Sequence, residues 1–283
     1  MRIDAHQHFW RIADRKGEWP PAELAAIHRD FVPADLQPWL QRGRIDGTVL
    51  VQTLSSAADT DYMLGLADEH SFILGVVGWV DMKREDAAAQ IKERALHPKF
   101  KGLRPMLQDL PDDDWIADPA LDAAVHTMIE NKLCFDALVL PRHLGALHRL
   151  ASRHPSLRIV IDHAAKPFIA RREMQPWQSD MARLASLPNV HCKVSGLLTE
   201  AEQGAGQASL QPYVQALWTL FGPERLMWGS DWPVVNLATD YAQWQGISES
   251  LLDALQPAAS AADRAAIFGG NAARFYQLGI DLS

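Results

Sequence analysis

The 283-residue chain has little cysteine and no long hydrophobic run. Its two cysteines, Cys134 and Cys192, lie in apolar, strand-like segments, so we expect buried thiols in a reducing compartment and no disulfide scaffold. The longest apolar run, residues 72–80, is too short to span a bilayer. The opening MRIDAHQHFW also lacks the basic-then-apolar order of a signal peptide. These absences favour a cytoplasmic protein that does not bind membranes.

The sequence also has no strong excess of positive or of negative residues. The 27 Lys and Arg residues are outnumbered only modestly by 35 Asp and Glu, which gives a formal charge of −8. A nucleic-acid-binding protein normally has a basic face, and the sequence predicts none. With 48% apolar residues and 17 each of Gly and Pro, the composition is that of a globular protein. We expect one domain over residues 1–283, a small-molecule partner, and a monomer or homodimer.

What the sequence does have is a repeated unit, in which a short apolar or β-branched run precedes a helical pattern. The runs are at 2–8, 47–52, 72–81, 100–106, 133–139, 157–163, 190–196 and 226–231. The helical patterns noted between and after them are at 59–70, 118–131, 142–153, 208–221, 261–268 and 271–278. Asp59 or Thr60 is expected to cap the first helix, and Asp118, just before Pro119, the second.

Eight strands alternating with helices predict an α/β fold, a (β/α)8 TIM barrel. The alternative is an open doubly wound sheet, which normally has fewer strands and often a Gly-rich turn after the first. Here the first run ends in His-Gln-His and contains no GxGxxG pattern, which argues against a dinucleotide site.

Barrel enzymes place their sites at the C-terminal ends of the strands. Strand alternation puts Asp4, His6 and His8 on one face of the first strand. Two histidines at this spacing suit a metal ion or a substrate carbonyl, although hydrogen-bonded core histidines are the other interpretation. His163 ends the sixth run and Asp231 the eighth. An aspartate there can bind a metal or deprotonate water, although a helix N-cap is its alternative role.

Other side chains near strand ends are candidates for binding a substrate. Arg104 ends the fourth run, where a guanidinium can orient an oxygen-rich ligand. Strand alternation points Lys193 into the barrel, where it needs a counter-charge or a substrate and where Asp136 is its expected partner. If the alternation is shifted by one residue, Lys193 is instead a solvated surface charge. The flat faces of tryptophans suit sugars, although filling the core is their other role. The remaining candidates are Gln52, Trp79 and Trp232.

Five motifs together resemble a known superfamily: DAHQHFW, GLRP, IDHAAKP, GSDWP and GGNAARFY. They are similar to those of the amidohydrolase superfamily, and more narrowly to its sugar lactonase branch. This branch includes L-fuconolactonase and L-rhamnonolactonase, with 2-pyrone-4,6-dicarboxylate lactonases as more distant members. The likeness covers essentially the whole chain and implies a distorted barrel that hydrolyses a cyclic ester. It identifies four site residues: His6, His8, His163 and Asp231.

The fifth run, LCFDALV, departs from the pattern of most metal-dependent members, which have a lysine or histidine ligand there. The resemblance therefore implies either no required cofactor or one divalent metal, first of all zinc, held by His6, His8 and Asp231. Asp231 would activate water, while His6, His8 and His163 would polarise the carbonyl directly or through that metal. The residues expected to hold the ring are Arg104, Lys193, Gln52, Trp79 and Trp232.

The acidic balance and the ten tryptophans favour a neutral sugar lactone. Among such lactones, the family resemblance puts L-fucono-lactone or a similar deoxy-aldonolactone first. One alternative is a 2-pyrone-4,6-dicarboxylate-type lactonase or a metal-dependent decarboxylase or amide hydrolase. Another is a non-catalytic sugar-acid binding protein, against which three imidazoles around one carboxylate argue. Residues 17–21 and 199–207 are further candidates to complete the pocket.

Overall fold

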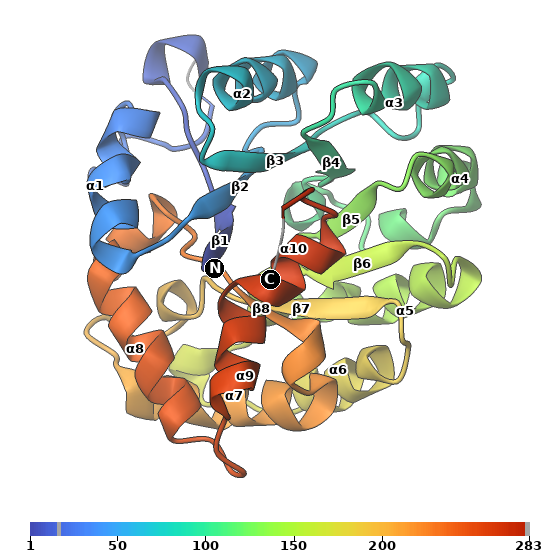
Figure 1. Cartoon of the computed structure of the whole chain (residues 1–283). Helices are drawn as coiled ribbons and strands as arrows, with labels where there is room; N and C mark the ends of the chain where they lie inside the picture. Colours follow the sequence, from blue (N-terminus) through green and yellow to red (C-terminus); the bar gives the residue numbers. More distant parts are fainter. Residues whose placement is uncertain (16–17, 281–283) are drawn as a thin grey trace.

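The computed structural model describes residues 1–15 and 18–280, and its centre is one sheet of eight parallel strands whose spatial order is the chain order (Figure 1). The strands are β1 (Ile3–Gln7), β2 (Gly47–Val51), β3 (Ile73–Gly78), β4 (Phe100–Leu103), β5 (Cys134–Ala137), β6 (Arg158–Ile161), β7 (Val190–Val194) and β8 (Leu226–Trp228). Each lies inside one of the eight predicted runs. The predicted TIM barrel is therefore confirmed.

Helices surround the sheet, and the last one lies across one end of it (Figure 1). They are α1 (Pro33–Gly43), α2 (Ala57–Glu69), α3 (Ala87–Ala95), α4 (Asp122–Glu130), α5 (Leu144–Arg153), α6 (Trp177–Ala185), α7 (Gln207–Phe221), α8 (Tyr241–Asp253), α9 (Ala261–Ala265) and α10 (Asn271–Phe275). None of the helices in the described part of the chain is both long and apolar enough to cross a membrane.

The two predicted helix caps have different outcomes. Asp118 caps its helical segment as expected, because its carboxylate accepts a hydrogen bond from the backbone N–H of Ala120 at 2.9 Å. The prediction of Asp59 or Thr60 as the cap of α2 is wrong. Ser56 is the N-cap, and its Oγ accepts from the backbone N–H of Asp59 at 3.3 Å. The helix therefore begins one turn earlier than expected.

The barrel closes between β1 and the segment that follows β8. The backbone N–H of Asp231 donates to the carbonyl of His6 at 2.8 Å, and that of His8 donates to the carbonyl of Trp232 at 2.7 Å. Since β8 ends at Trp228, these closing bonds come from residues beyond the strand. The closure itself therefore holds His6, His8 and Asp231 beside one another.

Strand β1 does not alternate regularly. Its pairing with β2 shifts register between Asp4 and Gln7. Asp4 accepts hydrogen bonds from the backbone N–H of Ser230 at 2.8 Å and from the Tyr241 hydroxyl of α8 at 3.0 Å. His6, in contrast, lies among polar side chains inside the barrel. The prediction that Asp4 shares a face with His6 is therefore wrong, because a bulge-like irregularity reverses the alternation.

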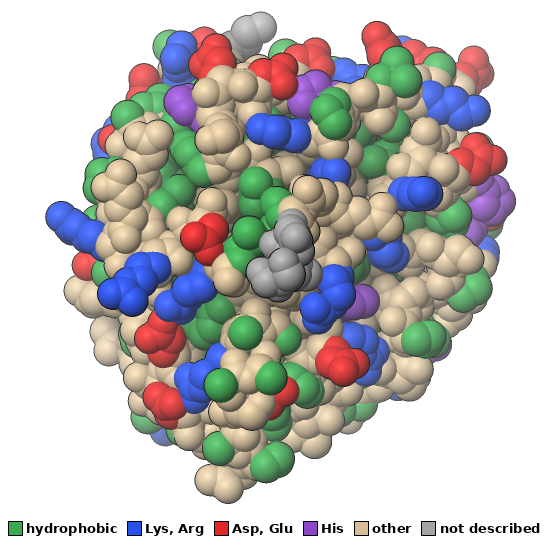
Figure 2. Space-filling view, in the orientation of Figure 1, with side chains coloured by type: hydrophobic (Ala, Val, Ile, Leu, Met, Phe, Trp, Pro, Cys, Tyr) green, Lys and Arg blue, Asp and Glu red, His purple; other side chains and the backbone are tan. Residues whose placement is uncertain are grey.

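Helix α10 lies across one end of the barrel (Figure 1). Its Phe275 and the following Tyr276 pack in one buried cluster with Ile3, Val49 and Met227 from the strands. Seen from this end, acidic and basic side chains of the described residues are interspersed (Figure 2). Because this end is filled with side chains, polar groups for chemistry are gathered at the opposite end.

His191 at this filled end should make stability depend on pH. Its ring lies 4.8 Å from that of Phe275, and burial lowers its pKa to about 4. In the unfolded chain His191 binds a proton near pH 6.5, whereas in the folded chain it binds one only near pH 4. The contribution of His191 to the free energy of unfolding therefore falls as the pH drops from about 6.5 to 4. We expect His191→Gln to flatten the loss of unfolding free energy between pH 7 and pH 5, measured by urea denaturation. The exposed His126→Gln is the control, and equal slopes for both variants would contradict the assignment.

Candidate active site

The four residues predicted to be catalytic meet at the C-terminal end of the barrel. Oδ1 of Asp231 lies 3.2 Å from Nε2 of His8, 3.7 Å from Nε2 of His6 and 3.8 Å from Nε2 of His163. All four side chains are buried. Three imidazoles thus converge on a single carboxylate oxygen. His6 lies on β1 and His8 just after it, His163 follows β6, and the carboxylate of Asp231 follows β8.

His163 reaches this point through a left-handed turn. Strand β6 ends at Ile161, and the four residues from His163 to Lys166 have φ values of 52°, 52°, 61° and 50°. Left-handed backbone costs roughly 1–2 kcal/mol for each residue with a Cβ. Such strain persists where surrounding structure imposes it, and it is typical of functional sites.

The surroundings hold this turn in place. The Trp177 indole N–H donates to the carbonyl of Ala164 at 2.7 Å, and the hydroxyl of Ser195 lies 2.9 Å from Nδ1 of His163. Gly196 has a φ of 61°, and a Cβ there would lie 2.5 Å from Nδ1 of His163. Glycine is therefore needed at position 196 both for its own backbone and for the position of the imidazole.

Burial decides the charge of these groups. It lowers the pKa of His8 and His163, to about 4 for His163, and holds the pKa of His6 well below its usual value. Burial alone would raise the pKa of Asp231, but the three histidines around it outweigh that effect and lower it. At neutral pH the site thus combines neutral imidazoles with an ionised carboxylate, the form of Asp231 that can accept a proton from water.

Lys193 is fully buried and makes the ion pair with Asp136 that the sequence suggested. Its Nζ lies 2.6 Å from Asp136 Oδ2, 3.0 Å from Asp162 Oδ1 and 3.1 Å from Nδ1 of His6. Burial raises the pKa of Asp136 to about 6, while Lys193, His6 and Arg104 outweigh the burial of Asp162 and hold its pKa well below the usual value. Lys193 therefore fixes the ring of His6 from behind.

Asp162 is a site residue that the sequence reasoning missed. It lies directly before His163, and its Oδ2 accepts from Nη1 of Arg104 at 3.3 Å. Strand alternation assigns adjacent residues to opposite faces, but the left-handed turn brings both side chains to the same end of the barrel. The pair of polar residues at the end of an apolar strand was the available signal.

The buried donors also fit one divalent metal ion. One ligand atom each from His6, His163 and Asp231 lie within 4.8 Å of one another. His8 belongs beside them: its Nδ1 donates to the carbonyl of Val51 at 2.7 Å, so its unprotonated Nε2 faces Oδ1 of Asp231. Two acceptor atoms facing each other are satisfied by a cation or a proton between them. Imidazole and carboxylate are ligands that zinc prefers, and His163 extends the predicted set.

A cavity of about 250 Å³ opens beside this cluster. Its lining residues are His8, Trp19, Leu24, Thr53, Arg104, Met106, Gln108, Asp109, Leu138, His163, Lys166, Thr199, Glu200, Asp231, Val234 and Leu237. Among the predicted substrate-binding residues, Arg104 lies in this wall. Both candidate loops contribute as well, through Trp19 and through Thr199 and Glu200, although residue 17 lies outside the described residues.

The other four predicted substrate-binding residues lie outside this lining. Gln52 donates from its side-chain amide to the carbonyl of Arg104, and Lys193 forms the buried ion pairs described above. Trp232 packs edge-to-face against Phe9, and the backbone of Trp79 bonds to the Thr60 hydroxyl. Their contact with a substrate stays a prediction, and Gln52 and Lys193 act in this structure through Arg104 and His6.

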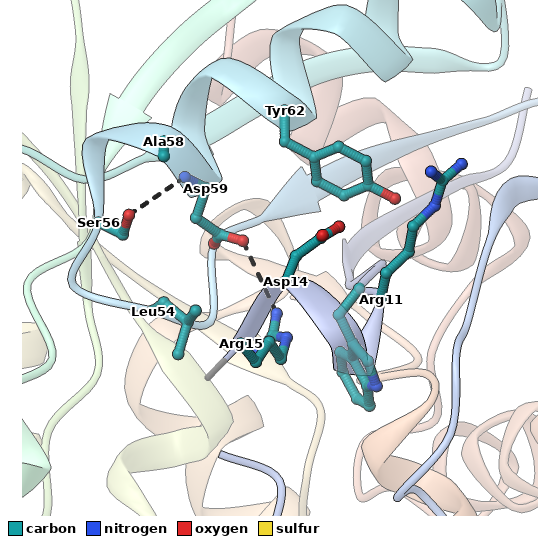
Figure 3. A pocket seen from close by; sticks show the side chains of 9 residues that line it. Arg11, Asp14, Arg15, Leu54, Ser56, Ala58, Asp59 and Tyr62 are labelled. Carbon is teal, nitrogen blue, oxygen red and sulfur yellow. Dashed lines mark hydrogen bonds and ion pairs between the residues drawn. The ribbon is translucent and has the colours of Figure 1, made fainter. Parts of the chain in front are cut away.

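Behind the wall, Arg15 connects the cavity to a second pocket of about 230 Å³ (Figure 3). The Arg15 guanidinium donates to the carbonyl of Trp19 at 2.7 Å and to the hydroxyl of Thr53 at 2.5 Å. It also lies 3.7 Å from the Asp59 carboxylate. Trp19 and Thr53 both line the central cavity. One buried cation therefore holds two parts of the cavity wall together.

Comparison with known proteins agrees with this architecture. Residues 3–278 match the amidohydrolase family. The chain is 53% identical to the L-fucono-1,5-lactonase of Burkholderia ambifaria, over 98% of this chain and 96% of that protein. It is 35% identical to the L-fucono-1,5-lactonase of Burkholderia multivorans, with the same shares covered.

A solved structure shares the fold over its full length. It is an amidohydrolase from Burkholderia multivorans crystallised with bound Zn, with a TM-score of 0.90 and 35% identity over 98% of this chain and 99% of that one. These matches bear out the resemblance of the sequence motifs to the sugar lactonase branch. The chain belongs to the amidohydrolase family.

Proposed function

We propose that this protein hydrolyses L-fucono-1,5-lactone, or a closely similar deoxy-aldonolactone, to the aldonic acid. The observation that carries the proposal is the convergence of three neutral imidazoles on the ionised Asp231 beside the cavity. The similarity to two L-fucono-1,5-lactonases supports the choice of substrate. A lactone is an activated ester, so a base and an electrophile at one end of a pocket meet its chemical needs.

The charge of the cavity wall favours a neutral substrate. The wall carries two cations, Arg104 and Lys166, and three carboxylates, Asp109, Glu200 and Asp231. Arg104 is already paired with Asp162, which lies behind the wall. A dicarboxylate pyrone would therefore meet more negative than positive charge, whereas an uncharged sugar lactone would not be repelled.

The rest of the wall suits a deoxy sugar. Its apolar members are Trp19, Leu24, Met106, Leu138, Val234 and Leu237. A methyl group buried against such side chains contributes about 0.8 kcal/mol for each carbon removed from water. The apolar wall thus gives the methyl group of a deoxy-aldonolactone a favourable contact that a hydroxymethyl group would lose in part.

The mechanism follows from the positions of the side chains. Asp231 accepts a proton from a water molecule whose oxygen attacks the lactone carbonyl. His163 can donate from Nε2 to the developing oxyanion, because the Ser195 hydroxyl can donate to its Nδ1. The ring C–O bond then breaks, and the leaving oxygen takes the proton from Asp231 to give the hydroxy acid. Arg104 faces the same end and orients the substrate.

A divalent cation, zinc first, held by His6, His8, His163 and Asp231 would supply positive charge that polarises the carbonyl and acidifies water. We keep both forms of the proposal, with no required cofactor and with one metal. We further propose a single domain over residues 1–283 that acts in the cytoplasm as a monomer or homodimer. Its partner is the small-molecule lactone, and neither nucleic acid nor membrane takes part.

A pH-indicator assay tests the proposal. We would measure turnover of L- and D-aldonolactones and of 2-pyrone-4,6-dicarboxylate, before and after a zinc chelator and with zinc added back. Turnover of L-fucono-1,5-lactone at least tenfold faster than that of the pyrone is expected, and the chelator decides between the two forms. Absence of lactone turnover with zinc added would overturn the proposal. Sugar-acid binding without turnover, or metal-dependent decarboxylation, would then replace it.

Arg15 should affect substrate binding more than the chemical step. Arg15→Met removes the two hydrogen bonds to Trp19 and Thr53, each of which has a charged donor worth about 1.5–3 kcal/mol. We expect the KM for the lactone to rise about tenfold, with kcat changed less than threefold, in steady-state kinetics.

A matched control for this variant lies in the same side pocket. Arg11 lines that pocket, is exposed, and does not line the central cavity (Figure 3). Arg11→Met should therefore leave KM within about twofold of the unmodified protein. An equal rise of KM in the two variants, or a loss of kcat alone in Arg15→Met, would show that Arg15 does not position the wall.

A further inference from the structure

Lys166 and Glu200 are charged side chains of the cavity wall that the proposed reaction does not use. Lys166 ends the left-handed turn after β6, and Glu200 ends the helical turn Leu198–Glu200 after β7. Nζ of Lys166 lies 2.9 Å from Oε1 of Gln108 and 3.9 Å from Oε1 of Glu200. Both line the cavity, with side chains only 24% and 26% exposed.

The spacing of this pair is the informative feature. An ammonium has three donors, and the described residues give Lys166 one hydrogen bond, to Gln108. At 3.9 Å, Lys166 and Glu200 attract each other without a direct hydrogen bond. Withdrawing two charges from water without joining them is unfavourable unless another polar group engages them. The pair therefore offers unused donors and an unused acceptor side by side in the cavity.

The pair is also electrostatically close to the reacting end. Burial raises the pKa of Glu200. The charge of Lys166 lowers this pKa, and the charge of Asp231 raises it. The charge of Lys166 in turn contributes, after burial, to the lowered pKa of His163. Because Lys166 and Glu200 line the same cavity as Asp231 and His163, a substrate whose carbonyl lies at Asp231 and His163 can reach this pair with the rest of its ring.

We propose that Lys166 and Glu200 form a subsite for a vicinal diol, which binds two neighbouring hydroxyl groups of the lactone ring; this inference rests on the proposed function. One hydroxyl accepts a hydrogen bond from the Lys166 ammonium, and its neighbour donates to the Glu200 carboxylate. A hydroxyl group is both donor and acceptor, so an ammonium and a carboxylate side by side match a diol. Substrates without those hydroxyls leave the pair unsatisfied and are rejected strongly.

Two substrates separate this role from general catalysis. L-fucono-1,5-lactone and δ-hexanolactone share the six-membered ester ring and its methyl group, but the second has no hydroxyl groups. We would measure kcat/KM for both with the unmodified protein, Lys166→Met and the isosteric Glu200→Gln. Each variant should lower kcat/KM for the sugar lactone by about 30- to 300-fold, and the ratio of the two substrates' kcat/KM values should fall at least tenfold.

The control is the same lysine-to-methionine substitution at a position away from the cavity. Lys83 forms a surface ion pair with Asp118 at 2.5 Å, and Lys83→Met should leave the substrate ratio unchanged. If Lys166→Met and Glu200→Gln lower kcat/KM equally for both lactones, or leave the ratio unchanged, the diol subsite is wrong. If the unmodified protein hydrolyses neither lactone, the proposed function fails and the subsite falls with it, a result visible before any variant is made.

Discussion

Replacing Asp231 with asparagine should lower kcat for the lactone by about a thousandfold, the scale of a lost general base. The amide has nearly the same shape as the carboxylate but cannot accept the proton of the attacking water. Asp231 also has a φ of 57°, a conformation that asparagine tolerates well, so the backbone should not change. Steady-state kinetics with a pH indicator would measure the loss, and a melting temperature would confirm the fold.

The matched control is Asp253→Asn. Asp253 ends α8, and its side chain is 73% exposed and pairs with Arg264 on the surface. This variant should have a kcat within twofold of the unmodified protein. Near-normal turnover by a folded Asp231→Asn would refute the assignment of Asp231 as the base and direct attention to the neutral histidines.

The strands were more predictable than the helices for a physical reason. Buried parallel strands consist of continuous apolar runs, and each of the eight runs contains one strand. Four helices, α1, α3, α6 and α8, follow no strong local signal that the sequence reasoning used. Helix α1 contains Pro38, and its N-cap residue is Val32, whose side chain cannot form a capping hydrogen bond. Packing on the barrel, which no single segment encodes, stabilises such helices.

The candidate site was predictable where residues end strands and unpredictable where the backbone leaves strand geometry. His6, His8, His163 and Asp231 come together as the motifs indicated. Asp162 was missed because alternation fails once the chain turns left-handed at His163. Glu200 belongs to a loop whose path depends on contacts with distant segments. A rule of period two therefore identifies strand ends but not the turns that complete the cavity.

Replacing Lys193 with methionine should destabilise the protein by about 3–5 kcal/mol, the usual cost of removing one partner of a buried ion pair. Methionine has a similar length, so little space is lost. Asp136 and Asp162, both fully buried, would lose the ammonium that lies 2.6 and 3.0 Å away. Urea denaturation at pH 8 would measure the change. Lys83→Met, which breaks a surface pair of similar length, should cost at most about 1 kcal/mol.

The pH dependence of the stability lost in Lys193→Met shows whether the loss comes from the unpaired carboxylates or from changed packing. Burial already raises the pKa of Asp136 to about 6, and removing Lys193 takes away an attraction that lowers it, so the pKa should rise further. When the pKa of a carboxyl group is higher in the folded than in the unfolded state, the folded state is favoured at a pH below the unfolded pKa. That advantage is lost as the pH rises through the folded pKa. The penalty of Lys193→Met should therefore be larger at pH 8 than at pH 6, and the double variant Lys193→Met, Asp136→Asn should recover part of it. An equal loss at both pH values in the single variant would show that packing, and not unpaired charge, is what Lys193 contributes.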